Sequence, residues 1–130
     1  MPTEHPMKSK GGISRLFKAL RYSAQGLRAA LRHEAAFRQE LALSLPLLLL
    51  LPWVAEGPLH ALALVGVWVA VWVVELINSA IEALADAQSL GHHPLLGRAK
   101  DLGSAAVLLT LLFALATWGL ALLQWGLRAA

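Results

Sequence analysis

The sequence predicts an all-α integral membrane protein, in which an amphipathic surface helix precedes three transmembrane helices. Of its 130 residues, 58% are hydrophobic and 15% are charged, which leaves too few polar side chains to cover a soluble domain of this size. Long apolar segments alternate with short polar ones. Eight of the eleven Lys and Arg residues come before residue 39. This uneven distribution is typical of a chain that contacts a membrane surface.

The N-terminal segment divides into a leader and a helix. Residues 1–12 hold two prolines and two glycines and are predicted to be a disordered leader, followed by one membrane domain over residues 13–130. No short apolar core with a cleavage site occurs here, so we expect no cleavable signal peptide. Over residues 13–32, apolar side chains recur every three or four positions with Arg and Lys between them. This pattern predicts a helix in the membrane interface, with a possible break at Gly26.

A cytosolic helix packed on another domain would show the same pattern, but the chain has no room for that domain. The first transmembrane helix is predicted over residues 35–54, whose 20 residues span about 30 Å, enough to cross the hydrocarbon core. Pro46 is expected to kink it, and Trp53 lies where interfacial aromatic residues are found. A turn over residues 55–58 leads to a second span over residues 59–84.

The third span is predicted over residues 104–125, after a polar loop over residues 86–103 that carries Arg98 and Lys100. Because loops rich in Lys and Arg stay in the cytoplasm, the N-terminus and this loop are expected inside and the 55–58 turn outside. Basic residues beside three apolar spans favour lipid headgroups or phosphates as partners and not nucleic acid. The chain has no cysteine, which excludes disulfides, thiol chemistry and cysteine–zinc sites.

Polar residues gather on one face of the second span. They are Glu75, Asn78, Ser79, Glu82 and Asp86. Counted from Glu75, the others follow after 3, 4, 7 and 11 residues, which places all five on one side of a helix. Counted from Leu59, Glu75 lies about 24 Å along the helix and Glu82 about 34 Å, so both fall near the inner boundary of the hydrocarbon. A carboxylate inside a span costs at least about 2.5–3.5 kcal/mol. A polar seam between helices would explain Asn78 and Ser79, but two carboxylates need a positive partner.

Two positive partners are available. Carboxylates without cysteine suit Mg²⁺ better than Zn²⁺, and Lys100 could lie close by. Glu34, at the entrance to the first span, is expected at the depth of Glu82. These residues could cradle magnesium and phosphates at the cytoplasmic rim. Neither a P-loop nor a dinucleotide fingerprint is present, so a nucleotide would have to be held by helix side chains. His92-His93 is interpreted as a solvated pair more readily than as a metal site.

Three segments carry a family resemblance: Glu34-Ala-Ala-Phe-Arg-Gln-Glu40, Val74-Glu-Leu-Ile-Asn-Ser-Ala-Ile-Glu-Ala83 and Gly97-Arg-Ala-Lys-Asp-Leu-Gly-Ser-Ala-Ala-Val107. In order and spacing they closely resemble the bacterial integral-membrane diacylglycerol kinases, over about residues 13–125. The resemblance implies a homotrimer in the bacterial inner membrane with active sites shared between subunits. It also implies transfer of the γ-phosphoryl group of MgATP to diacylglycerol, which gives phosphatidic acid.

The resemblance also implies roles for individual residues. Glu75 matches the general base, Asn78 an essential polar position beside it, and Glu34 and Glu82 the ligands of Mg²⁺. The positions that match nucleotide contacts are Arg15, Tyr22, Glu34, Glu82, His93, Lys100 and Asp101. The positions that match lipid contacts are Arg15, Ser23, Arg28, Trp53, Glu75, Ser104 and Trp118.

Three alternatives remain. Residues 87–96 (AQSLGHHPLL) differ from the commonest diacylglycerol kinase pattern, and their His-Pro is similar to the related undecaprenol kinases. A small ion- or proton-coupled transporter would use Glu75 as its membrane carboxylate, but it would give no purpose to Glu34, Lys100 and Asp101. A non-catalytic membrane subunit would lack magnesium-dependent nucleotide binding.

Overall fold

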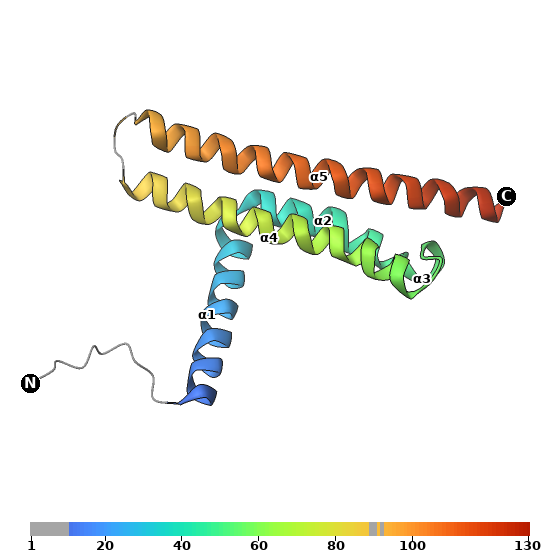
Figure 1. Cartoon of the computed structure of the whole chain (residues 1–130), viewed down its shortest axis with the longest axis horizontal. Coiled ribbons are helices and arrows are strands. Elements are labelled where there is room, and N and C mark those ends of the chain that lie inside the picture. Colours follow the sequence, from blue (N-terminus) through green and yellow to red (C-terminus); the bar gives the residue numbers. More distant parts are fainter. Residues whose placement is uncertain (1–10, 89–90, 92) are drawn as a thin grey trace, which may run out of the picture.

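A computed structural model describes residues 11–88, 91 and 93–130, and every regular element among them is a helix. The helices in chain order are α1 (Gly12–His33), α2 (Ala35–Leu49), α3 (Leu51–Val54), α4 (Pro58–Gln88) and α5 (Pro94–Ala129). The two longest, α4 and α5, run antiparallel side by side, α2 lies along α4, and α1 projects away from this bundle (Figure 1). The all-helical prediction is confirmed. Most of the predicted leader lies outside the described residues.

The α1 helix is continuous through Gly26, so the break considered there does not occur. It begins after Gly11, whose φ of 121° is a conformation that favours glycine. Its apolar side chains stay exposed in the single chain, with Ile13 75% and Phe17 68% accessible. Ala30 is its one buried residue. An amphipathic helix that buries so little of its apolar face needs a membrane surface or another subunit to cover it.

A sharp elbow at Glu34 joins α1 to α2. The Glu34 backbone is extended (φ −105°, ψ 104°), and its N–H donates to the Ala30 carbonyl at 2.9 Å, so the residue ends one helix and starts the next. The Arg38 guanidinium, one turn into α2, donates to the Leu31 carbonyl of α1 at 3.0 Å. A cation at these last carbonyls also complements the α1 dipole. The elbow therefore holds Glu34 at the junction of two helices.

The first predicted span forms two helical pieces. Pro46 lies within α2, and the interruption comes at Leu50, between α2 and α3. Pro52 accounts for a break near this point, because proline has no N–H to donate to the carbonyl four residues earlier. Two helices, Pro58–Gln88 and Pro94–Ala129, are each long and apolar enough to cross a membrane. The 15-residue α2 is shorter than such a crossing requires by itself.

The polar loop predicted over residues 86–103 is mostly helix, and that prediction was wrong in extent. The α4 helix continues to Gln88, and α5 already begins at Pro94. Proline fits the first helical position, and the Leu95 N–H donates to Nδ1 of the preceding His93 at 3.2 Å. Lys100 and Asp101 therefore lie on the first turns of a helix, which fixes their directions relative to α4.

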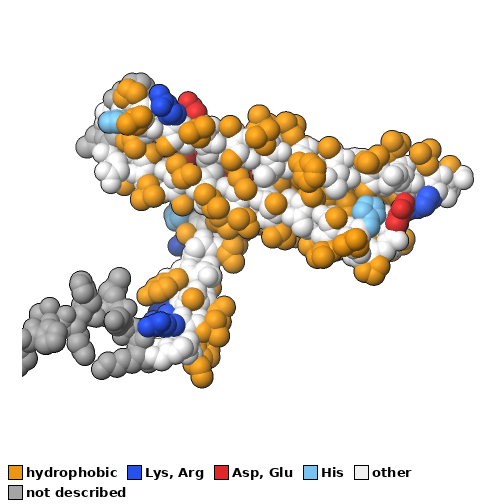
Figure 2. All heavy atoms as spheres, in the orientation of Figure 1, with side chains coloured by type: hydrophobic (Ala, Val, Ile, Leu, Met, Phe, Trp, Pro, Cys, Tyr) orange, Lys and Arg blue, Asp and Glu red, His pale blue; other side chains and the backbone are white. Residues whose placement is uncertain are grey.

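The apolar core lies where α3, α4 and α5 meet. Its buried side chains are Val54, Leu64, Trp68, Val71, Ala114, Trp118 and Ala121. Two indole N–H groups tie the helices together: Trp72 donates to Ser44 Oγ at 3.2 Å, and Trp118 donates to the Leu64 carbonyl at 3.0 Å. At the far end, Arg128 pairs with Glu56 and donates to the Val54 carbonyl at 3.3 Å. Charged side chains gather mainly at the bundle's ends and on α1 (Figure 2).

Candidate active site

Two carboxylates, one on α4 and one at the elbow, lie within electrostatic range of a third that is buried on α4. Glu75 on α4 is buried, with 4% of its surface exposed. It lies within electrostatic range of Glu82, two turns further along α4, and of Glu34 at the elbow. Ser79 Oγ donates to Glu75 Oε1 at 3.5 Å, which orients this carboxylate. The fold therefore brings the predicted base and the two predicted metal ligands into one region.

Asn78 lies between these carboxylates and α5. Its Nδ2 donates to Glu82 Oε1 at 3.4 Å, while its buried Oδ1 has no hydrogen-bond partner among the described residues. The amide packs directly against Gly103 of α5, where a Cβ would overlap Oδ1. Asn78 is thus fixed from one side by a carboxylate and from the other by a neighbouring helix.

A groove of about 590 Å³ runs between α1 and α4. Its lining is apolar apart from Ser23 and His33 of α1, Glu34 at the elbow and Ser79 of α4. We name it the α1–α4 groove. It connects a predicted lipid contact, Ser23, with the carboxylate region through Glu34. A groove with apolar walls and one polar end suits a molecule with a hydrocarbon chain and a polar head.

A second, smaller pocket of about 340 Å³ lies at the end of the bundle where α4 and α5 are joined. It holds three predicted nucleotide contacts, His93, Lys100 and Asp101, and we name it the end pocket. Lys100 Nζ forms an ion pair with Asp86 Oδ1 at 2.9 Å. Lys100 precedes the predicted third span, and its hydrogen bond to Asp86 raises its pKa, so the ammonium stays charged. Lys100 also lies within electrostatic range of Glu82, which links this pocket to the carboxylates.

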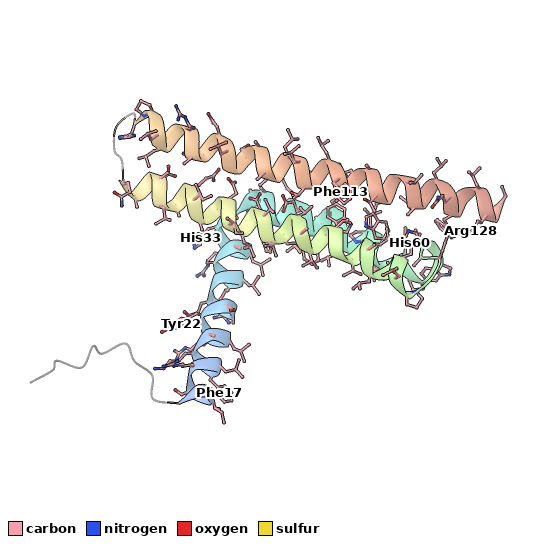
Figure 3. All side chains as sticks on the ribbon, viewed as in Figure 1. Phe17, Tyr22, His33, His60, Phe113 and Arg128 are labelled. Atoms are coloured by element: carbon pink, nitrogen blue, oxygen red, sulfur yellow. The ribbon has the colours of Figure 1, made fainter. Side chains whose placement is uncertain are left out.

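Other predicted residues are not brought to this region within one chain. Arg15, Tyr22 and Arg28 are exposed along α1, and Tyr22 lies midway along the projecting helix (Figure 3). Ser104 is exposed on α5, and Trp53 is 62% exposed on α3. Trp118 is buried in the core against Leu64, which precedes Glu75 by eleven residues, or about 16 Å along a helix. Trp118 is thus held in the core of its own chain, and only the exposed residues of this set could contact a second chain.

The carboxylates fit magnesium only if a nucleotide supplies some of its ligands. No group of three or more His, Cys, Asp or Glu side chains within residues 11–88, 91 and 93–130 is arranged to hold a metal ion. Mg²⁺ needs no such cage, because it commonly takes one or two carboxylates and completes its octahedron with phosphate oxygens and water. The donor set here, two separated carboxylates with Lys100 within electrostatic range of Glu82, suits magnesium that arrives with a nucleotide.

Sequence reasoning assigned no role to two residues at this site. Glu40 on α2 is buried, its Oε2 has no hydrogen-bond partner in the described structure, and it lies within electrostatic range of Glu75. The sequence does contain a sign of its importance, because Glu40 is a carboxylate directly beside the apolar segment of the first span. The other is Gly103, which sequence alone could not distinguish from the other glycines.

Comparison with known proteins shows the family of the chain. Residues 21–122 match the family model described as prokaryotic diacylglycerol kinase. The chain is 44% identical over 107 residues to a diacylglycerol kinase of Escherichia coli strain K12, covering 82% of this chain and 88% of the relative. It is 42% identical over 121 residues to that of Pseudomonas aeruginosa, covering 91% and 96%. It is 45% identical over 117 residues to the diacylglycerol kinase of Helicobacter pylori strain 26695, covering 89% of this chain and 90% of the relative. The chain thus belongs to the prokaryotic diacylglycerol kinase family.

Proposed function

We propose that this protein is an ATP-dependent diacylglycerol kinase, which transfers the γ-phosphoryl group of MgATP to the lipid hydroxyl and gives phosphatidic acid. One observation carries the proposal: buried Glu75 lies within electrostatic range of both Glu34 and Glu82, and it accepts a hydrogen bond from Ser79, which lines the α1–α4 groove together with Glu34. The end pocket, with Lys100 and Asp101, is linked to Glu82 on the other side. Lipid and nucleotide could therefore approach one carboxylate region from two directions.

In the proposed reaction the hydroxyl oxygen of diacylglycerol attacks the γ-phosphorus of ATP. The bond from the γ-phosphorus to the bridging oxygen breaks, and ADP leaves with the electron pair. Glu75 accepts the hydroxyl proton, and Ser79, which donates to its Oε1, keeps that carboxylate oriented. Lys100 offsets charge on the phosphates. Phosphoryl transfer depends mostly on such positioning and neutralisation, and helix side chains can supply both.

Magnesium would be held by Glu34 and Glu82. When bound, it would neutralise phosphate charge. The elbow supports this role, because Glu34 lies at the start of α2 and its side chain faces the α1–α4 groove. Asn78, hydrogen-bonded to Glu82 Oε1, would orient the second ligand. Carboxylates that are held in this way bind a cation without first having to reorganise.

The direct test is Glu75→Gln, assayed with radiolabelled ATP and diacylglycerol in mixed micelles. We expect at least a 100-fold loss of kcat, because the amide cannot accept the hydroxyl proton. Glu56→Gln is the matched control, since Glu56 lies at the far end of the bundle beside Arg128, and it should retain wild-type turnover. Near-normal turnover of folded Glu75→Gln would remove Glu75 from the role of base.

The lipid acceptor needs its own test. The similarity of His93-Pro94 to the related undecaprenol kinases makes undecaprenol the competing acceptor. Purified protein with MgATP should phosphorylate diacylglycerol at least tenfold faster than undecaprenol at equal mole fraction. The reverse order would make the chain an undecaprenol kinase. ATP-independent proton flux in liposomes would instead favour the transporter hypothesis.

We further propose that the chain works as a homotrimer in the bacterial inner membrane, with the N-terminus and the α4–α5 connection in the cytoplasm. Arg15 and Tyr22 are exposed, and Tyr22 lies midway along the projecting α1 helix (Figure 3), which supports sites shared between subunits. With no cysteine in the sequence, single introduced cysteines report topology without background. Gly57→Cys should react with an impermeant maleimide from outside the cell, and Ala87→Cys only after permeabilisation. The opposite labelling would invert the proposed orientation.

A further inference from the structure

Gly103 is distinguished from the other glycines by what lies next to it. All ten glycines of the chain are described, and nine have no side chain or other helix within 4 Å of the place where a Cβ would stand. At Gly103 that Cβ would overlap Oδ1 of Asn78 and would lie 3.3 Å from Asn78 Cγ. Because Gly103 has no side chain, the amide of Asn78 can pack directly against α5.

This contact fixes which way the amide points. A Cα–H bond of Gly103 points where a Cβ would stand, toward Oδ1, which has no conventional hydrogen-bond partner among the described residues. Such Cα–H···O contacts are weakly attractive. On the opposite edge Nδ2 donates to Glu82 Oε1 at 3.4 Å. Turning the amide over would place its oxygen against the Glu82 carboxylate, which is repulsive, so the two neighbours select one orientation.

A methyl group at position 103 would overlap Oδ1 of Asn78, so the two groups cannot keep their present places together. Gly103 is buried between the helices, so the change Gly103→Ala would force the amide to rotate or push α5 away from α4. Rotation of the amide takes Nδ2 away from Glu82 and leaves that carboxylate without its orienting donor. Displacement of α5 removes the contact that selects one orientation of the amide. Groups that orient a metal ligand typically contribute about 10- to 100-fold to metal affinity or activity.

We propose that Gly103 is a positioning residue for phosphoryl transfer, which acts through Asn78 to orient the Glu82 carboxylate toward the cation of the nucleotide. The proposal rests on the assignment of Glu82 as a cation ligand. Gly103 itself touches neither substrate. Its contribution is to let α4 and α5 approach so closely that Asn78 has one position, and a side chain of any size removes it.

The first experiment compares Gly103→Ala with Gly126→Ala. Both change a glycine of α5 to alanine and gain the same helix propensity, but position 126 has open space around its Cβ direction. The full chain is purified in detergent micelles, and binding of Mn²⁺ with a non-hydrolysable ATP analogue is followed by electron paramagnetic resonance of the free ion. Gly103→Ala should weaken Mn²⁺ binding about 10- to 100-fold, with the KM for diacylglycerol within twofold, while Gly126→Ala should match wild type.

A double-mutant cycle then asks whether Gly103 acts through Asn78. Asn78→Ser removes the amide and makes room for a methyl group, so Asn78→Ser with and without Gly103→Ala should bind Mn²⁺ equally within twofold. This pair stays measurable even if Gly103→Ala alone fails to fold. Wild-type Mn²⁺ affinity in folded Gly103→Ala, or independent effects of the two changes, would overturn the proposal. The Mn²⁺ measurement does not use the lipid, so it tests the proposal about Gly103 separately from the proposed function. If the wild type did not phosphorylate diacylglycerol, that result would contradict the proposed function.

Discussion

Glu40 and Glu75 bring two carboxylates into the interior of the bundle from different helices. Neither is exposed, the two lie within electrostatic range, and Glu40 Oε2 has no hydrogen-bond partner among the described residues. Like charges in an apolar surrounding destabilise the fold, because each carboxylate loses hydration and gains repulsion. Replacing Glu40 by an uncharged side chain of the same shape should therefore stabilise the fold.

We expect Glu40→Gln to raise the unfolding temperature in micelles by about 2–5 °C, which corresponds to about 1 kcal/mol for a chain of this size. Glu56→Gln is the matched control with the opposite sign, because it breaks the exposed pair with Arg128 and should lower stability by less than about 1 kcal/mol. Thermal unfolding followed by tryptophan fluorescence measures both. A lower unfolding temperature for Glu40→Gln would mean that the charge of Glu40 is compensated.

At the end pocket, Lys100→Met should lower kcat/KM for ATP about 100-fold or more, because a cation beside phosphates acts in a partly shielded site. The Lys100 side chain pairs with Asp86 and lies within electrostatic range of Glu82, so its loss also leaves those carboxylates without a counter-charge. Arg98→Met changes the charge of the same helical turn. It should stay within about threefold of wild type in steady-state kinetics at varied ATP. Equal losses for both variants would point to general surface charge.

The sequence predicted the main carboxylates of the site but not their neighbours. Glu75, Asn78 and Glu82 share a helical face, and that face can be read from spacing alone. The burial of Glu40 and the close approach at Gly103 depend on how α2 and α5 pack against α4. No local pattern encodes an approach between residues as far apart in the chain as Asn78 and Gly103.

At the scale of elements, the elbow between α1 and α2 determines where Glu34 lies. A side-chain hydrogen bond crosses the bend, from Arg38 to the Leu31 carbonyl. The sequence predicted both helices, with α1 within one residue of its expected bounds at each end. The polarity of residues 94–103 predicts a loop, whereas the structure has the polar first turns of α5 there. A helix that continues beyond the bilayer can carry polar residues, and Pro94 at its first turn was the available signal.

We expect Arg38→Ala to loosen the elbow, since the lost hydrogen bond is worth about 0.5–1.5 kcal/mol. The amides of residues 31–35 should exchange hydrogen about three- to tenfold faster, and turnover should fall several-fold through a higher Mg²⁺ requirement. Arg21→Ala removes an arginine from the middle of α1 and serves as the control for charge. Unchanged exchange at the elbow in Arg38→Ala would show that backbone geometry alone sets the bend.

At the scale of the whole molecule, the exposed apolar surface of α1, α4 and α5 is more than one chain can bury. Large side chains such as Leu59 (81%), Leu109 (68%) and Phe113 (67%) are exposed, which suits lipid tails and neighbouring copies. The sequence predicted the membrane class from composition, but the number of subunits comes only from the family resemblance. Spacing along one chain carries no direct information about contacts between copies.

The proposed sharing of active sites between subunits makes a specific prediction about mixed assemblies. Glu75→Gln and Arg15→Ala chains, each with little activity alone, should recover about a tenth or more of wild-type turnover when co-reconstituted. A subunit that keeps Glu75 could then combine with a neighbour that keeps Arg15. Measuring turnover against mixing ratio tests this, with two batches of Glu75→Gln as the negative control. No recovery at any ratio would place the two residues in sites built from one chain.

The helical start of α5 carries a consequence for how the gene can change in length. Lys100 and Gly103 stand on one continuous helix, with Asn78 and Asp86 of α4 facing them. One codon inserted between Asp101 and Leu102 would turn everything before it by about 100° relative to everything after it. The Lys100 ammonium and Gly103, against which the Asn78 amide packs, could then no longer face α4 together. Natural selection should therefore remove codon insertions or deletions in this stretch even where it accepts single replacements.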